Sequence, residues 1–205
     1  MEIQSLPVGS LGTNCYLVCD ETTKLCAIID PGGDASYIST IMQGYDYTPC
    51  AILLTHGHYD HTGGVAGLTA QWSDVPVYLN HRDLYPEDAS LSQLFPLVSN
   101  TRDYGEGDTI QVGTLTITVM ETPGHSEGSV TLRCGNALFC GDTLFAGSMG
   151  RTDFPGGNMD KILSSLKRLA ELDGNFTVYP GHMEPSTLEQ ERQNNPYVLH
   201  AIQHA

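Results

Sequence analysis

The sequence has 205 residues and a formal net charge of −15, from 9 lysines and arginines against 24 aspartates and glutamates. This length is enough to bury one hydrophobic core, and the 40% of hydrophobic residues argues against a disordered chain. The excess of acid repels phosphate groups, so nucleic acids and anionic membranes are excluded as expected partners.

The sequence also argues against a membrane or secreted protein. No apolar run approaches the roughly 18 residues that a membrane-spanning helix needs. The N-terminus has no basic segment followed by an apolar one, so we expect no secretory signal. The six cysteines include no Cys-x-x-Cys pair and are expected to be reduced core residues. We therefore expect a cytoplasmic protein, either a monomer or a small homo-oligomer.

Short β-prone runs that end in turn signals predict strands along most of the chain. The first three are expected to form an antiparallel meander, and the pairs around Gly113-Thr114 and Gly135-Asn136 to form hairpins. The predicted strands span residues 3–8, 14–19, 25–30, 50–55, 75–79, 109–112, 115–121, 129–134, 137–140 and 177–179.

Helices are predicted between these strands from capping residues and apolar periodicity. Asp34 is expected to cap one helix, and Ile162, Leu166 and Leu169 fall on one face of another. Residues 86–108 are rich in Pro, Ser, Asp and Gly and predict a long loop with one helical turn. The predicted helices span residues 35–42, 63–70, 81–84, 159–172 and 185–193. This mixture predicts an α/β fold of packed sheets with helices outside, as one domain over residues 1–205.

The strongest chemical signal is the run His56-Gly57-His58-Tyr59-Asp60-His61, directly after the buried strand at 51–54. Three imidazoles and a carboxylate at a strand end suit zinc, iron or manganese. His125, Asp142 and His182 follow later predicted strands, each next to a glycine. Loops at strand ends are where a rigid sheet can support a metal site.

Seven candidate ligands are too many for one tetrahedral ion, so the sequence predicts two divalent ions, with zinc favoured over iron or manganese. Asp142 is expected to bridge them, because a bridging group with two oxygens must be a carboxylate. Asp60 is also expected to orient the nucleophile. The first ion is assigned to His56, His58 and His125, and the second to Asp60, His61 and His182.

This ligand set, together with Asp30-Pro31-Gly32 and Gly141-Asp142-Thr143, resembles the metallo-β-lactamase superfamily over nearly the whole chain. The branch it resembles is that of short bacterial proteins like glyoxalase II, the hydroxyacylglutathione hydrolases. The resemblance implies an αββα sandwich with the metals at one edge. It also implies hydrolysis of a small thioester such as S-lactoylglutathione, with a metal-bridging hydroxide as nucleophile.

The substrate-binding residues are less clearly marked. Residues 145–154, with Phe145 and Phe154 at the two ends, are expected to shape the pocket. Arg151 stands where glyoxalase II has a lysine that meets a glutathione carboxylate, so the resemblance implies an anion anchor. An equally simple alternative is that Arg151 pins its own loop through Asp153. Glyoxalase II enzymes also carry a C-terminal helical region with basic contacts to glutathione, and this chain ends before such a region.

Three alternatives remain open at this stage. Resemblance to the persulfide dioxygenases implies one iron held by His56, His125 and Asp142. A strained lactone or another strained acyl substrate fits the same hydrolytic chemistry. A metal-binding interaction protein without catalysis is the non-enzyme alternative, although such a protein has no need of an open site for two ions.

Overall fold

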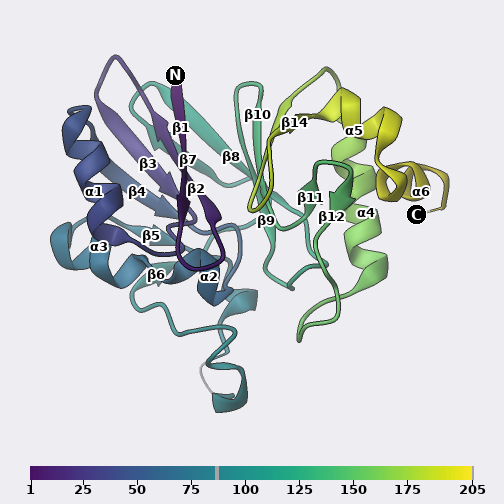
Figure 1. Cartoon of the computed structure of the whole chain (residues 1–205), viewed down its shortest axis with the longest axis horizontal. Coiled ribbons are helices and arrows are strands. Elements are labelled where there is room, and N and C mark those ends of the chain that lie inside the picture. The colour runs from purple at the N-terminus through teal and green to yellow at the C-terminus, as the bar shows by residue number, and fades with distance from the viewer. Residues whose placement is uncertain (86–87, 205) are drawn as a thin grey trace.

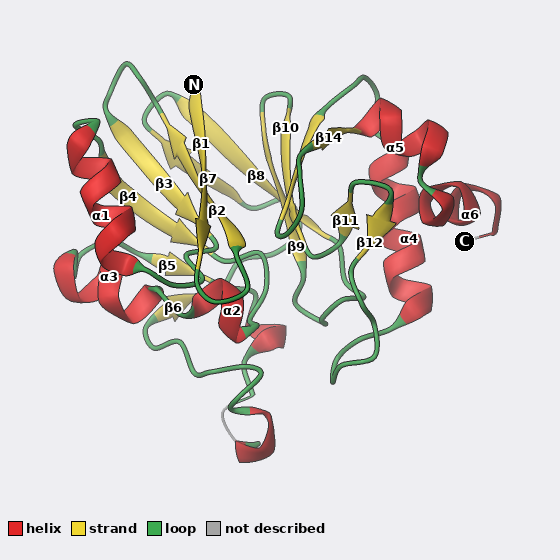
Figure 2. Cartoon of the chain, viewed as in Figure 1, coloured by secondary structure: helices red, strands yellow, loops and turns green. Residues whose placement is uncertain are grey.

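We describe a computed structural model that covers residues 1–85 and 88–204. Two six-stranded sheets face each other, and helices cover the outer face of each (Figures 1 and 2). The αββα sandwich that the resemblance implied is therefore confirmed. Residues 86 and 87, at the start of the predicted long loop, lie outside the described residues.

The N-terminal sheet follows the order β1-β2-β3-β4-β5-β6. The first three strands form the predicted antiparallel meander, and β3 to β6 run parallel because helices or loops carry the chain back between them. The elements of this half are β1 Glu2–Val8, β2 Thr13–Cys19, β3 Leu25–Ile29, α1 Ala35–Gly44, β4 Thr48–Leu53, α2 Tyr59–Thr62, α3 Val65–Gln71, β5 Val77–Tyr78 and β6 Thr101–Arg102.

The C-terminal sheet follows the order β14-β13-β10-β9-β8-β7. Both predicted hairpins are present, and β13 pairs with β10 in parallel. The elements of this half are β7 Thr109–Val112, β8 Leu115–Glu121, β9 Val130–Cys134, β10 Ala137–Gly141, β11 Leu144–Phe145, β12 Ser148–Met149, α4 Met159–Ala170, β13 Thr177–Pro180, β14 Ser186–Thr187, α5 Leu188–Asn194 and α6 Pro196–His204.

The hydrophobic core has three layers that follow from the periodicity of the strands and helices. Alternate residues of β2 and β3 point outward against α1 and α3, and their neighbours point inward against the other sheet. The inner layer includes Ile29 and Leu53 from one sheet and Val119 and Leu132 from the other. On the far side, α4 packs its predicted apolar face on β10 and β13. All six cysteines are free thiols, and five are buried.

Several local predictions differ from the structure. Asp34 stands before α1, but its carboxylate accepts from the amide of Gly9 at 2.8 Å instead of capping the helix. The helix expected at 185–193 begins only at Leu188, because Thr187 provides its cap. It ends before Pro196, where α6 begins. The sequence reading missed α2, α6, β6 and the β11–β12 hairpin. No described helix combines the length and apolar character needed to cross a bilayer.

Candidate metal centre

All seven candidate ligands lie together at one edge of the sandwich. Strands β4, β8, β10 and β13 each end shortly before a turn that carries one or more of them. The ligand atoms within each of three overlapping groups lie within 4.8 Å of one another. These groups are His56, His58 and His125; His56, His61 and Asp142; and Asp60, His61 and His182.

The first group is a buried set of three imidazoles that face one another. Nε2 of His125 lies 2.9 Å from Nδ1 of His58. The ring of His56 is nearly perpendicular to those of His58 and His125, at 85° and 82°. Three rings that meet edge to face at one point are the arrangement that three imidazole ligands adopt around one ion.

The second group is more open to solvent. Nε2 of His182 lies 3.1 Å from Oδ2 of Asp60, and Nε2 of His61 lies 3.6 Å from the same oxygen. Asp60 and His61 lie in the single turn of α2, which turns both side chains back toward the end of β4. The side chain of His182 is 24% exposed, so substrate can approach from this side.

Asp142 stands between the two groups. Its Oδ1 lies 3.4 Å from Nε2 of His61, and its Oδ2 lies 3.5 Å from Nε2 of His125 and 3.7 Å from Nε2 of His182. Oδ1 of Asp142 therefore faces the second ligand group, and Oδ2 faces both the first and the second group. This placement suits a carboxylate shared by two ions.

The cluster has unsatisfied polar atoms that fit a metal site. Among the described residues, six buried side-chain nitrogen or oxygen atoms have no hydrogen-bond partner, and four of them are Nε2 of His56, His58 and His61 and Oδ1 of Asp142. Leaving a buried polar atom unpaired costs about 1–3 kcal/mol, so such a concentration needs a function. Divalent cations would satisfy this donor set of imidazole nitrogens and carboxylate oxygens.

The protonation states of the ligands follow from their surroundings. Burial, together with the neighbouring imidazoles, holds the pKa of His56 well below its usual value and lowers the pKa of His58 to about 3. Burial opposes a charge on His61 as well, but the carboxylates of Asp142 and Asp30 outweigh it and raise the pKa of His61. The hydrogen bond to Asp60 raises the pKa of His182.

Residues behind the ligands fix their orientation. Oδ2 of Asp30 accepts from Nδ1 of His61 at 3.0 Å, and the same carboxylate accepts from the amide and hydroxyl of Thr55 at 2.7 and 2.6 Å. Because Nδ1 of His61 donates to Asp30, its Nε2 is the nitrogen that faces the cluster. The contact with His61 shows that Asp30 supports a candidate ligand.

The turn that carries His182 is held from the other sheet. The side-chain amide of Asn14 donates to the carbonyl oxygens of Pro180 and Met183 at 3.1 and 2.8 Å, and the Tyr16 hydroxyl donates to Pro180 at 2.7 Å. Sequence reasoning missed these two residues. Their partners lie far along the chain, so no local signal marks them.

Position 181, next to His182, requires glycine because the side chains of Asp142 and His61 lie close to its backbone. A Cβ at this position would lie 2.2 Å from Oδ1 of Asp142 and 2.7 Å from the His61 ring. No larger residue fits without displacing one of these two side chains.

Aromatic side chains form the walls of the centre. The ring of Phe154 lies 6.0 Å from that of His58, and Phe145 lies 6.3 Å from His182. Phe95, which sequence reasoning missed, packs at 4.6 Å from His58. The side chain of Arg151 forms a two-point ion pair with Asp153, at 2.8 and 2.7 Å, and lies over the Phe154 ring. The structure thus has the loop-pinning contact that was the alternative to an anion anchor.

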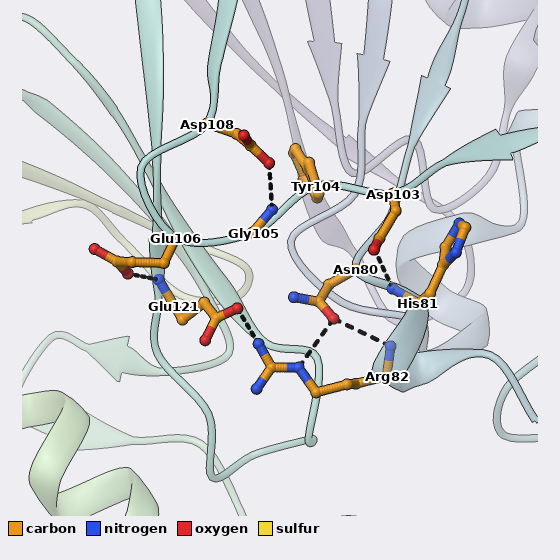
Figure 3. Close-up of a pocket in the computed structure, with 9 residues that line it drawn as sticks. All are labelled: Asn80, His81, Arg82, Asp103, Tyr104, Gly105, Glu106, Asp108 and Glu121. Atoms are coloured by element: carbon orange, nitrogen blue, oxygen red, sulfur yellow. Dashed lines mark hydrogen bonds and ion pairs between the residues drawn. The ribbon is translucent and has the colours of Figure 1, made fainter.

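A cavity of about 550 Å³ lies beside β6 and β8, and none of the seven candidate ligands lines it (Figure 3). Its carboxylates already have partners. Asp103 accepts from the amide of His81 and Asp108 from the amide of Gly105, both at 2.9 Å. The contact of Asp103 holds the turn at 81–83, and that of Asp108 closes its own loop.

Comparison with known proteins places this arrangement in a family. Residues 8–182 match the sequence model of the Metallo-beta-lactamase superfamily. The chain is 33% identical to the probable metallo-hydrolase YqgX of Bacillus subtilis, over 97% of this chain and 98% of that protein. It is 31% identical to the hydroxyacylglutathione hydrolase GloC of Haemophilus influenzae, over the same shares of the two chains.

Solved structures give the same result. The BLEG-1 B3 metallo-beta-lactamase is 34% identical with a TM-score of 0.86, over 96% of this chain and 99% of that chain. The di-iron-bound form of TTHA1623 is 34% identical with a TM-score of 0.80, over 95% and 99%. The relatives and the ligand cluster together support a metal-dependent hydrolase with a site for two ions.

Proposed function

The chain belongs to the metallo-β-lactamase superfamily, and from this premise we propose that it hydrolyses a small thioester, S-lactoylglutathione or a relative. The observation that carries the proposal is the pair of ligand groups with Asp142 between them. The similarity to the hydroxyacylglutathione hydrolase GloC supports the thioester as substrate class.

In this proposal His56, His58 and His125 would hold the first ion, Asp60, His61 and His182 would hold the second, and Asp142 would be shared by both. Two divalent ions, zinc in the first instance, would supply a nucleophile from water by lowering its pKa to about 7, and would polarise the substrate carbonyl.

The protein's own groups then position the reaction. The Asp60 carboxylate accepts from the Thr13 hydroxyl at 3.4 Å, a contact that a bound cation would leave in place. Its bond from Nε2 of His182 would give way to the cation. Asp60 lies at the open side of the centre, where it would orient the attacking water. Phe145 and Phe154 offer apolar surface to the acyl group and keep bulk water from it.

A thioester suits a centre that has no evident general acid. The leaving thiol has a pKa of about 8.5, so it departs as thiolate without being protonated first. Two acidic groups on the loops around the centre are engaged in ion pairs: Asp153 pairs with Arg151, and Glu127 pairs with Lys161.

A second candidate is hydrolysis of a β-lactam or a lactone. The structural likeness to the BLEG-1 B3 metallo-beta-lactamase, at 34% identity, favours this class. In a β-lactam or lactone the strained ring makes the acyl group reactive, so hydrolysis would not require a general acid.

The test combines metal analysis of the purified protein with a panel of thioesters, lactones, β-lactams and glutathione persulfide. We expect two ions per chain and the highest kcat/KM on a thioester, and Asp142→Ala should abolish this turnover. One iron per chain with oxygen uptake on the persulfide, and no thioesterase activity, would instead establish a dioxygenase. Unchanged turnover in His58→Ala and Asp142→Ala would place the activity outside this centre.

A further inference from the structure

Asp83 is a buried carboxylate that the metal centre described so far does not use. It is 2% exposed and lies at the end of the short turn His81–Asp83. Oδ2 of Asp83 accepts from the amide of Gly57 at 2.9 Å and from the hydroxyl of Ser126 at 2.7 Å. Oδ1 accepts from the amide of Gly128 at 2.6 Å. These partners come from two turns that lie far apart in the sequence.

Both turns carry ligands of the first metal position. Gly57 lies between His56 and His58, and Ser126 directly follows His125. A single carboxylate therefore joins the two segments that must converge around one ion. Two of the hydrogen bonds come from backbone amides and the third from a serine hydroxyl close to the backbone. They therefore fix the backbone of both turns.

Packing leaves little freedom in this arrangement. A Cβ on Gly128 would lie 2.7 Å from Cγ of Asp83, and one on Gly57 would lie 2.9 Å from Cβ of Asp83. The close fit means that a change in the position of Asp83 is passed on to both ligand turns.

The turn that presents Asp83 is itself held in place (Figure 3). Oδ1 of Asn80 accepts from the Arg82 amide at 3.1 Å, and Asp103 accepts from the His81 amide at 2.9 Å. The Arg82 guanidinium pairs with Glu121, near the end of β8. These contacts close the turn on itself and tie it to Asp103, directly after β6, and to Glu121 at the end of β8.

Burying a carboxylate costs desolvation free energy that an apolar side chain of the same size would not. No lysine or arginine contacts Asp83 among the pairs in the described residues. Three hydrogen-bond donors stabilise its charge, and a neutral side chain would avoid the desolvation cost. What the carboxylate adds is the ability to accept all three bonds at once.

We propose that Asp83 is a positioning residue that sets the spacing of the His56–His58 turn and the His125 turn, and through it the affinity of the first metal position. This inference rests on the proposed metal-dependent function. The second position should be far less sensitive, because its ligands are held by other residues, His61 by Asp30 and the His182 turn by Asn14.

The test is zinc affinity in Asp83→Asn. An asparagine has the same size and shape as the aspartate. Its NH₂ group cannot accept a hydrogen bond, so the bonds from Gly57 and Ser126, or the bond from Gly128, are lost. Zinc affinity is measured by chelator competition in two backgrounds: His182→Ala to report on the first position, and His58→Ala to report on the second. We expect zinc affinity to fall about 10–100-fold in the first background, as for other partners of metal ligands, and less than threefold in the second.

Asp20→Asn is the matched control. Asp20 is also 2% exposed, and it accepts from the amides of Thr114 and Thr22 and from the Thr23 hydroxyl at 2.7, 3.0 and 2.8 Å. It lies at the β2–β3 turn, away from the ligands, so its loss should lower the melting temperature of metal-free protein and leave zinc affinity unchanged. Ser126→Ala removes one of the hydrogen bonds to Asp83 and replaces Asp83→Asn in the test if that variant does not fold. We expect a smaller decrease in zinc affinity at the first position.

Each outcome has one meaning. Asp83→Asn or Ser126→Ala that loses thermal stability but binds the first zinc with wild-type affinity would overturn the proposal and make Asp83 a structural residue. Equal losses at both positions would overturn it too, since they indicate general distortion. A wild-type chain that binds no divalent ion would instead refute the proposed function itself.

Discussion

His125 and Arg151 are joined by a hydrogen bond of 2.8 Å from the imidazole Nδ1 to the backbone carbonyl oxygen. A carbonyl oxygen can only accept, so Nδ1 of His125 carries the proton and Nε2 is free to face the cluster. The same residue that fixes a candidate ligand with its backbone extends its side chain over Phe154 toward Asp153. Arg151 therefore links a candidate ligand, through its backbone, to the aromatic wall of the centre, through its side chain.

The first prediction concerns this loop. If Arg151 exchanges Asp153 for a substrate carboxylate, Arg151→Ala should raise KM for S-lactoylglutathione about tenfold, the equivalent of roughly 1.4 kcal/mol. The value of kcat should change little, because the contact is remote from the thioester. Asp153→Asn should lower KM by removing the competing carboxylate. Steady-state kinetics on this substrate and on a neutral thioester provide the measurement. An equal rise in KM for the neutral thioester would show that Arg151 only pins the loop.

Asp30→Asn should weaken the second metal position. The amide cannot accept from Nδ1 of His61 and from the Thr55 amide and hydroxyl as the carboxylate does. We expect a decrease of about 10–100-fold in zinc affinity at the second position. The effect is measured by chelator competition in the His58→Ala background. Asp34→Asn, which changes a carboxylate on the nearby Gly9 turn, is the control. Wild-type affinity in Asp30→Asn would refute the role of Asp30.

Gly181→Ala should empty the centre with the rest of the fold intact. The added methyl would meet Asp142 and His61, and such overpacking costs about 1–3 kcal/mol. We expect metal content measured on the purified protein to drop, while the far-ultraviolet circular dichroism stays that of the wild type. Gly44→Ala is the matched control, because a Cβ there meets nothing within 4 Å. Full metal content in Gly181→Ala would contradict the observed closeness.

Metal binding at pH 7 should release protons mainly from the second position. The pKa values of His61 and His182 are raised, so these imidazoles hold protons that a cation must displace. The pKa values of His56 and His58 are lowered, so these two are already neutral. Zinc titrations by calorimetry, in two buffers of different ionisation heat, count the protons. His182→Ala should release fewer than His58→Ala, and the reverse order would contradict this assignment.

Much of the centre could be predicted because its signals are local. A run of three histidines and an aspartate directly after an apolar strand is typical of a metal site, and His125, Asp142 and His182 repeat the same strand-then-turn setting. Parallel and antiparallel strands that end at one edge bring such turns together. The alternation of strands and amphipathic helices predicted packed sheets with helices outside, and the family resemblance implied the αββα sandwich itself.

The remaining features depend on contacts between distant residues. Asp83 looks like an ordinary residue of a helical turn, and its role appears only when Gly57 and Gly128 lie against it. Asp34 has the sequence of a helix cap, but the Gly9 amide from another turn takes its carboxylate. The β11–β12 hairpin is held from a distant segment, because Asn195 donates to the carbonyl oxygens of Phe145 and Ser148. No window of local sequence contains these pairs.

The division of the ligands between the two sheets has a mechanical consequence. His56, His58, Asp60 and His61 belong to the N-terminal half, whereas His125, Asp142 and His182 belong to the C-terminal half. Each candidate ligand group takes residues from both halves, so bound ions would link the two sheets. Removal of the ions should weaken the contact between the two halves, so the metal centre would contribute to the stability of the fold as well as to the chemistry.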